Sequence, residues 1–193
     1  MTSYWQLRQL ILPVFPLIGI GVTPREMRVA WNPMRCALLL FLALSGGGAA
    51  AEPAAAFEAQ IAAAVQSDQI TVVHFWAPWC PNCQHELAHH GWSDFLAANP
   101  SVKFIFITLW NDQEGLAVLA QNGVGPQPNL LVYLHPNPSR LREDKVSSLL
   151  GLPITWIPTT WVFAKGKLRY ALNYGELRFP MLQQLITDSA SAW

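Results

Sequence analysis

An uncharged apolar run ends three residues before the first of two closely spaced cysteines. The run, Ile70 to Ala77, is rich in β-branched and aromatic residues, which is typical of a central strand buried on both faces. Residues 79–83 (WCPNC) follow it, and the pattern beyond them predicts a helix over residues 80–98, bent at Gly91. The two cysteines are therefore predicted to lie where a strand passes into a helix.

Hydrophobic spacing and turn residues predict the remaining elements. Helices are expected over residues 52–69, 111–123 and 139–150 and from Pro180 onward. The helix at 111–123 has Asn111 as its N-cap and an acid three residues later. Strands are expected over residues 102–109, 130–134, 159–164 and 168–172, of which the last two form a hairpin. Because alternating strands and helices pair in parallel whereas a hairpin is antiparallel, we expect an α/β fold with a mixed central sheet and helices on both faces.

The positions of the two cysteines predict different chemistry for each. Cys80 is expected to be the N-cap of its helix, with Pro81 in the first helical position, where its missing N–H costs nothing. The N–H groups of Asn82 and Cys83 then point at the Cys80 sulfur and, with the positive end of the helix dipole, favour its thiolate. Cys83 lies one turn further along and is shielded. We therefore expect Cys80 to be the nucleophile and Cys83 to be the resolving thiol.

Other functions of a Cys-x-x-C pair have to be weighed against the redox function. Haem attachment requires a histidine directly after the second cysteine, and Gln84 stands there. The pair could hold copper or zinc together with His85 or His89, which are four positions apart on the predicted helix, so a metal-binding module stays an alternative. The sequence holds no second Cys-x-x-C pair, which favours redox chemistry. With a net charge of +0 and no basic run interleaved with aromatic residues, nucleic-acid binding is not expected.

The N-terminal residues follow the order of features found in export signals. Arginines precede a short apolar run, Ala37 to Leu44, and small residues follow it up to Ala51. The run is shorter than the roughly 20 residues that span a bilayer. We expect residues 1–51 to be an N-terminal extension with a signal peptide, and residues 52–193 to form one domain in the periplasm or another exported compartment, soluble after cleavage or tethered by the N-terminal segment. Cleavage after Ala51 removes Cys36, so only the Cys-x-x-C pair would remain.

Residues 75–86 (FWAPWCPNCQHE) closely resemble the active-site segment of the exported thioredoxin-like family that includes TlpA, ResA and the cytochrome c maturation thioredoxins. The resemblance covers about residues 70–190 and implies the thioredoxin fold. Residues 156–160 (WIPTT) are similar to the family's substrate loop, in which the proline is cis. The residues expected to contact substrate beside the dithiol are Trp79, Ile157, Pro158 and Thr159.

The resemblance implies a thiol:disulfide oxidoreductase that uses no cofactor. Its substrates are expected to be thiols and disulfides of exported proteins or apocytochromes, and its electron donor a membrane thiol reductase. We expect the chain to act as a monomer. Ile157 and the family favour a reductant, whereas Pro81 is shared with strong dithiol oxidases, so both directions of electron flow stay open.

Three residues near the dithiol match or depart from the family pattern. Glu86 matches a carboxylate that the family keeps near its active site, although a solvated helix position would explain it equally. Ala88 stands where many members carry a helix-kinking proline. His74 replaces the usual buried acid, and strand alternation puts it on one face with Val72 and Trp76. We expect His74 to lie beneath the dithiol as the proton acceptor for the resolving thiol, or else to be a core histidine bonded to a backbone carbonyl.

Overall fold

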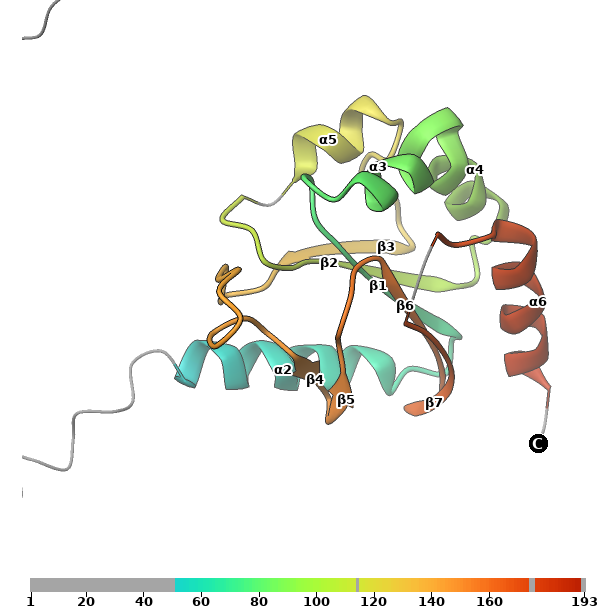
Figure 1. Ribbon diagram of the computed structural model, residues 1–193. Coiled ribbons are helices and arrows are strands. Elements are labelled where there is room, and N and C mark those ends of the chain that lie inside the picture. Colours follow the sequence, from blue (N-terminus) through green and yellow to red (C-terminus); the bar gives the residue numbers. More distant parts are fainter. Residues whose placement is uncertain (1–50, 114, 174–175, 192–193) are drawn as a thin grey trace, which may run out of the picture. The chain divides into compact units, whose positions relative to one another are not determined.

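A five-stranded sheet lies at the centre of the computed structural model, which describes residues 51–113, 115–173 and 176–191 (Figure 1). Residues 1–50, which include nearly all of the predicted signal peptide, lie outside the described residues. In spatial order the strands are β3 (Leu130–Leu134), β2 (Lys103–Thr108), β1 (Thr71–Trp76), β6 (Thr159–Ala164) and β7 (Lys167–Leu172). Strands β3, β2 and β1 are parallel to one another. Strand β6 is antiparallel to β1, and β7 is antiparallel to β6. The predicted mixed sheet is confirmed.

The central strand β1 is buried along its whole length and sends alternate side chains to the two faces of the sheet. On one face Val73 and Phe75 pack in a hydrophobic cluster with Phe57 and Ile61 of helix α2 (Ala51–Val65). Figure 1 shows α2 running beneath the sheet on this side. The predicted helix at 52–69 is therefore present and covers one face.

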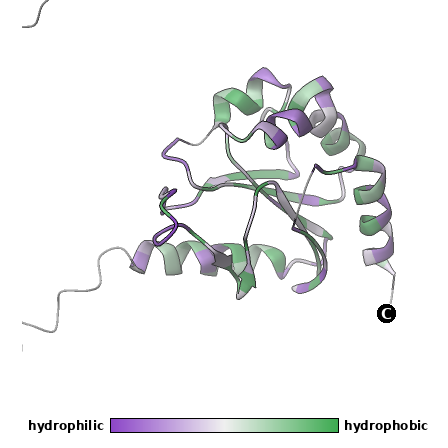
Figure 2. Ribbon diagram, viewed as in Figure 1, coloured by the Kyte–Doolittle hydropathy of each residue, from purple (hydrophilic) through white to green (hydrophobic). Residues whose placement is uncertain are grey.

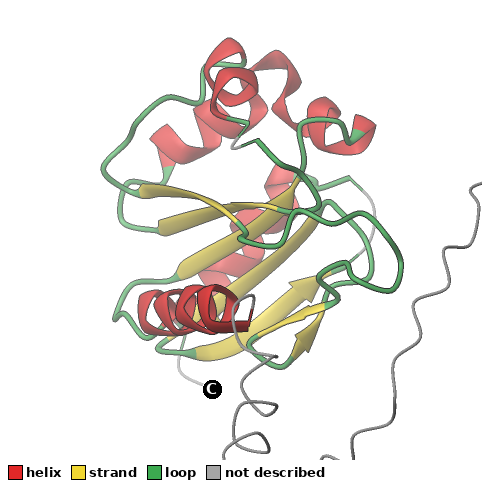
Figure 3. Cartoon of the chain, turned by 90° about the vertical axis from the view of Figure 1, so that its left-hand side faces the viewer, coloured by secondary structure: helices red, strands yellow, loops and turns green. Residues whose placement is uncertain are grey.

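The opposite face carries the remaining helices, as Figures 1 and 3 show. They are α3 (Pro81–Leu87), α4 (Gly91–Ala98), α5 (Leu116–Gln121) and α6 (Phe179–Ala190). Val72 and Trp76 of β1 belong to the same hydrophobic cluster as Trp92 of α4 and Leu182 of α6. Helices on both faces are thus confirmed. None of the helices in the described residues is long and apolar enough to cross a bilayer.

The predicted helix over residues 80–98 is broken into two by a single 3-10 turn, η1 (Ala88–His90). His89 and His90 take left-handed backbone conformations, with φ of 55° and 61°, so the break occurs without a proline at position 88. Gly91 itself has helical backbone angles, so the bend lies at His89 and His90, directly before the predicted position. A Cβ at Gly91 would lie 2.6 Å from the Phe179 ring, so close packing requires glycine there.

No helix forms over residues 139–150, where one was predicted. Side-chain oxygens of Asn137 and Ser139 accept the backbone N–H groups of Ser139 and Leu141, at 2.9 and 3.2 Å, and Asn137 also donates to the carbonyl of Asp144 at 2.7 Å. A helix would leave the first-turn N–H groups unpaired in any case, so the competing bonds are those to carbonyls. The carbonyl of Asp144 accepts from Asn137, and that of Val146 accepts the indole N–H of Trp110 at 2.9 Å. The segment is a largely hydrophilic loop (Figure 2) that ends in the short strands β4 (Ser148–Leu149) and β5 (Leu152–Pro153).

Helix α5 begins later than predicted. Its N-cap is Gly115, with φ of 71°, and Asn111 instead donates its side-chain N–H to the carbonyl of Gln113 within a local turn. A Cβ at Gly115 would lie 2.8 Å from both the Trp76 and the Pro78 side chains. The close approach to the end of β1 and the positive φ both require glycine at this N-cap.

The C-terminal elements follow the prediction. Lys165 and Gly166 between β6 and β7 both have positive φ, as the tightest hairpin turns require. Helix α6 has Pro180 in its first turn, where a missing N–H costs no hydrogen bond.

Candidate active site

Cys80 and Cys83 form a disulfide at the start of α3, with their Cα atoms 5.2 Å apart. Cys80 is the N-cap in an extended conformation, Pro81 follows in the first turn, and the N–H of Cys83 donates to the Cys80 sulfur at 3.3 Å. The predicted junction between strand and helix is therefore present, with one of the two expected donors on the sulfur.

The two cysteines differ in what surrounds them. Cys80 is 4% exposed and lies in the wall of an open cavity of ≈ 520 Å³. Cys83 is 1% exposed and does not line this cavity, and both cysteines belong to the hydrophobic cluster between the sheet and the helices. Contact with the cavity is therefore what distinguishes Cys80 from Cys83.

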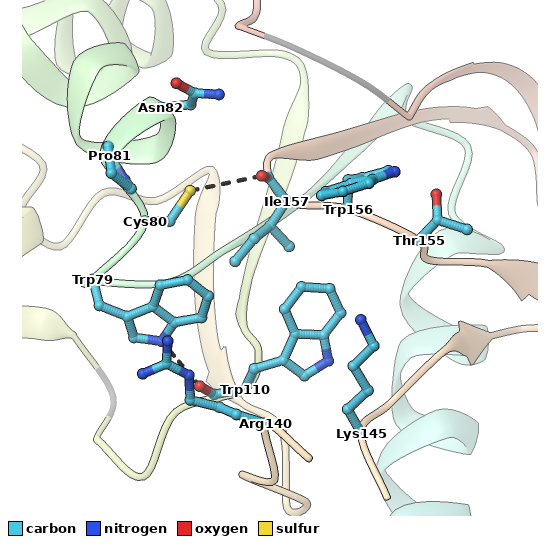
Figure 4. Close-up of a pocket in the computed structure, with 10 residues that line it drawn as sticks. All are labelled: Trp79, Cys80, Pro81, Asn82, Trp110, Arg140, Lys145, Thr155, Trp156 and Ile157. Atoms are coloured by element: carbon cyan, nitrogen blue, oxygen red, sulfur yellow. Dashed lines mark hydrogen bonds between the residues drawn. The ribbon is translucent and has the colours of Figure 1, made fainter. Parts of the chain in front are cut away.

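The predicted substrate loop lies directly beside Cys80. The peptide bond between Ile157 and Pro158 is cis, and the carbonyl oxygen of Ile157 is 3.6 Å from the Cys80 sulfur (Figure 4). Thr159 is buried and donates its hydroxyl to the carbonyl of Trp156 at 2.8 Å. The structure thus brings Ile157 to the dithiol, with Pro158 and Thr159 forming the buried base of the loop.

Aromatic and basic side chains complete the cavity, and sequence reasoning identified only some of them. Trp79 is 36% exposed and donates its indole N–H to the carbonyl of Trp110 at 3.0 Å. The Arg140 guanidinium carbon lies 3.9 Å from the centroid of the Trp79 ring, and the Lys145 ammonium lies 4.5 Å from that of Trp110. Arg140 and Lys145 come from the loop that was predicted to be a helix, so no local signal pointed to them.

His74 lies on the helix-covered face of β1, as strand alternation predicted. It is 2% exposed, and its ring packs against the rings of Trp92 and Phe106, with centroids 4.6 and 5.0 Å apart. Its Nδ1 is 2.9 Å from the hydroxyl of Thr160, so it is a core histidine whose partner is a side-chain hydroxyl rather than the expected backbone carbonyl. Burial lowers the pKa of His74 to about 3, because the cation is poorly solvated there, and the ring is neutral at ordinary pH.

Glu86 is buried in the same region, and the alternative of a solvated helix residue is wrong. Its Oε1 accepts the backbone N–H of Leu177 at 2.6 Å, and its Oε2 accepts the indole N–H of Trp92 at 3.4 Å. Burial outweighs these two hydrogen bonds and raises the pKa of Glu86 to about 7. The carboxyl group can therefore gain and lose a proton near neutral pH.

His74 and Glu86 contact each other beneath the dithiol-bearing helix. His74 Nε2 lies 3.5 Å from Glu86 Oε2, and both side chains are almost completely buried. With the pKa of one lowered and that of the other raised, the pair is a neutral imidazole beside a carboxyl group rather than a fixed ion pair. A small cavity of ≈ 30 Å³ borders Glu86, Thr160 and Pro158, and so extends from the carboxyl group to the substrate loop.

The histidines of the metal alternative do not share one helix face. α3 ends at Leu87, so His85 is in the helix whereas His89 is in the left-handed turn that follows. His85 Nδ1 instead lies 2.9 Å from an oxygen of Glu176. In the described part of the chain, no three His, Cys, Asp or Glu side chains are grouped as a metal site requires.

Comparison with known proteins agrees with this arrangement. A family model described as a thioredoxin-like domain matches residues 57–190. Sporulation thiol-disulfide oxidoreductase A of Bacillus subtilis is 38% identical over 53 residues, which are 26% of this chain and only 31% of the relative.

Two solved structures with similar chain traces have low sequence identity. A secreted disulfide oxidoreductase of Mycobacterium tuberculosis, described as homologous to E. coli DsbE, is 18% identical, with a TM-score of 0.47 over 65% of this chain and 85% of that one. StoA from Bacillus subtilis is 23% identical, with a TM-score of 0.43 over 62% and 83%. Because the family model spans most of the 193 residues, the chain belongs to the thioredoxin-like domain family.

Proposed function

We propose that this protein is an exported thiol:disulfide oxidoreductase whose redox centre is Cys80 and Cys83. The observation that supports it most strongly is the disulfide at the N-terminus of α3, with one sulfur in a cavity wall beside a cis-proline loop and the other in the core. The match to a relative named as a thiol-disulfide oxidoreductase is consistent with this activity.

The exchange proceeds in two displacement steps. The Cys80 thiolate attacks one sulfur of a substrate disulfide, so that a Cys80–substrate disulfide forms, the substrate disulfide breaks, and the first substrate thiolate leaves and takes up a proton. The Cys83 thiolate then attacks Cys80, forming the Cys80–Cys83 disulfide and releasing the second substrate thiol. The substrate gains two electrons and two protons, and the dithiol loses them.

The second step requires a group that accepts the proton of Cys83. Glu86 lies three residues after Cys83 on α3, which places the two on neighbouring turns of one helix face. Its pKa of about 7 suits a base that works near neutral pH, whereas a pKa of about 3 makes His74 a weak base. We therefore assign the proton to Glu86, with His74 as a positioning residue that contacts the same carboxyl group, and this revises the predicted role of His74.

The resemblance of the active-site segment favours a reductant of exported proteins or apocytochromes. A membrane thiol reductase would then reduce its Cys80–Cys83 disulfide again. Pro81 is shared with strong oxidants as well as with cytochrome maturation members, so a dithiol oxidase stays the alternative. Equilibrating the protein with glutathione buffers and measuring its reduction potential separates the two. A potential well below that of the glutathione pair supports the reductant, and one well above it supports the oxidase.

The test of the activity itself uses a neutral substrate. The reduced protein should reduce dipyridyl disulfide in a reaction that Cys80→Ser abolishes. Failure of the reduced wild-type protein to exchange with this or any protein disulfide would contradict the proposed function.

A further inference from the structure

Two positive side chains are held against indole rings in the cavity beside Cys80. Arg140 stacks on Trp79 and Lys145 lies over Trp110, at 3.9 and 4.5 Å from the ring centroids. Figure 4 shows Cys80 and Ile157 at one end of the cavity and the two basic side chains at the other. A molecule that presents a sulfur to Cys80 therefore has both cations within the same cavity.

The charges of Arg140 and Lys145 are available to a ligand. Among the described residues, neither side chain has a carboxylate within 4.0 Å, and no Asp or Glu side chain lines the cavity. The two acids of the same loop, Glu143 and Asp144, are exposed and lie outside the cavity wall. A cation on an aromatic ring keeps its charge and its N–H donors, so each can still bind an anion.

The loop that carries the cations is anchored rather than free. The indole N–H of Trp110 donates to the carbonyl of Val146 at 2.9 Å, next to Lys145. The backbone N–H of Lys145 in turn donates to the carbonyl of Leu141 at 2.8 Å, which closes a turn one residue after Arg140. A site held in this way binds an anion with little loss of conformational entropy.

We infer that this cavity binds acidic side chains of a polypeptide, so that Cys80 acts preferentially on disulfides with Asp or Glu next to the cysteine. The inference rests on the proposed function and names its substrate class. Trp156 is 60% exposed and Trp79 36%, so the cavity opens onto an aromatic rim that suits an extended chain. The volume of ≈ 520 Å³ is within the range of sites that enclose a few side chains.

The test compares three cyclic disulfide peptides that differ at one position beside a cysteine, which is Glu, Gln or Lys. Reduced wild-type protein should reduce the Glu peptide about tenfold faster than the Gln peptide, in second-order rate constant, and the Lys peptide more slowly than both. The double substitution Arg140→Gln with Lys145→Gln should bring all three rates together. Charge reversal, Arg140→Glu with Lys145→Glu, should make the Lys peptide the fastest.

A matched control removes the same charge from another part of the molecule. Lys165 and Lys167 lie at the turn between β6 and β7, at the opposite end of β6 from the substrate loop. The double substitution Lys165→Gln with Lys167→Gln should leave the preference for the Glu peptide intact. The rate at which iodoacetamide alkylates Cys80 is measured in the Arg140/Lys145 double variant as well, so that a change in thiolate reactivity is separated from a change in peptide preference. A fall of all three peptide rates in parallel with the alkylation rate, with their ratios unchanged, would mean that the cations act on the thiolate and would overturn the inference.

Two further outcomes would also overturn it. One is equal rates for the three peptides in the wild type, and the other is a preference that survives in the double variant. If oxidised glutathione is preferred but the peptides are not discriminated, the acidic ligand is a small molecule and the assignment to polypeptides is wrong. In each case reduction of dipyridyl disulfide would continue, whereas its loss would mark failure of the proposed function instead.

Discussion

Cys80 and Cys83 are three residues apart, yet the two sides of the dithiol differ in almost every physical property. On the Cys80 side there is an open cavity with exposed indole rings and two cations. Cys83 does not line that cavity, and three residues after it on the same helix stands Glu86, a buried carboxyl group of raised pKa in contact with the neutral His74. The proposed function assigns recognition and attack to the first side, and proton transfer during resolution to the second.

The largest expected effects come from exchanging the two sulfurs for oxygen. Cys80→Ser removes the attacking sulfur and should reduce disulfide reduction by at least ~1000-fold. Cys83→Ser keeps the attack but not the release, so a mixed disulfide on Cys80 should accumulate. Mass spectrometry of the trapped species identifies the attached sulfur. If Cys80→Ser traps substrate on Cys83 instead, the two sides have been assigned the wrong way round.

Glu86→Gln should slow the resolution of a Cys80 mixed disulfide by about 10- to 100-fold near neutral pH, because a positioned base typically contributes about 100-fold or more. The amide can still accept the N–H of Leu177, so the fold should persist. Stopped-flow rates measured from pH 5 to 9 should rise through about pH 7 in the wild type and lose this step in the variant. Glu52→Gln, at an exposed position of α2 on the other face of the sheet, is the matched control, and equal slowing by both variants would contradict the assignment.

His74→Ala should slow the same step at least tenfold. Because His74 contacts Glu86 at 3.5 Å, the readout that separates positioning from packing is the pH profile. Loss of a positioning contact shifts the midpoint of the profile away from about pH 7, whereas loss of packing lowers stability and leaves the midpoint where it was. An unchanged resolution rate in folded His74→Ala protein would leave His74 with a packing role alone.

The buried pair also predicts how stability depends on pH. The pKa of Glu86 is raised from 4.5 to about 7, so its contribution to folding is complete below pH 4.5 and is lost as pH rises through 7. The pKa of His74 is lowered from 6.5 to about 3, so its contribution is complete above pH 6.5 and is lost as pH falls through 3. The two effects oppose each other between pH 4.5 and 6.5, and stability should fall on either side.

Urea unfolding of the oxidised protein from pH 3 to 9 measures this profile. Glu86→Gln should abolish the loss between pH 6.5 and 7, which is below ~1 kcal/mol because it covers about half a pH unit at ~1.4 kcal/mol per unit. It should also leave the His74 contribution without its opposing effect, so that stability of the variant rises by ~3 kcal/mol from pH 4.5 to 6.5, where the wild type is nearly flat. The fall on the acidic side should remain, because His74 is unchanged. A variant whose profile parallels that of the wild type at high pH would show that the carboxyl group of Glu86 is not held in its protonated form.

The features that the sequence predicted correctly are those determined by neighbouring residues. The junction at Cys80 depends on an apolar run followed by a capping position, and the hairpin depends on Lys165 and Gly166. The failed helix at 139–150 is not a local matter, because the carbonyl of Val146 accepts the indole N–H of Trp110, 36 residues away.

Sequence analysis named Glu86 and His74 but not their partners, because these contacts join distant segments. Glu86 accepts the N–H of Leu177, 91 residues away, and His74 meets Thr160 through the register of β1 and β6, 86 residues apart. Neither pairing has a local pattern. Likewise, the loop that carries Arg140 is hydrogen-bonded to Trp110, from a distant part of the chain.

The division of roles between the two sulfurs is tested most directly by alkylation of the reduced protein. At mildly acidic pH and with less than one equivalent of iodoacetamide, a thiolate favoured at the start of α3 and open to the cavity reacts first. Peptide mass spectrometry should therefore find the label on Cys80, with Cys83 largely unmodified. Label found first on Cys83 would contradict the account.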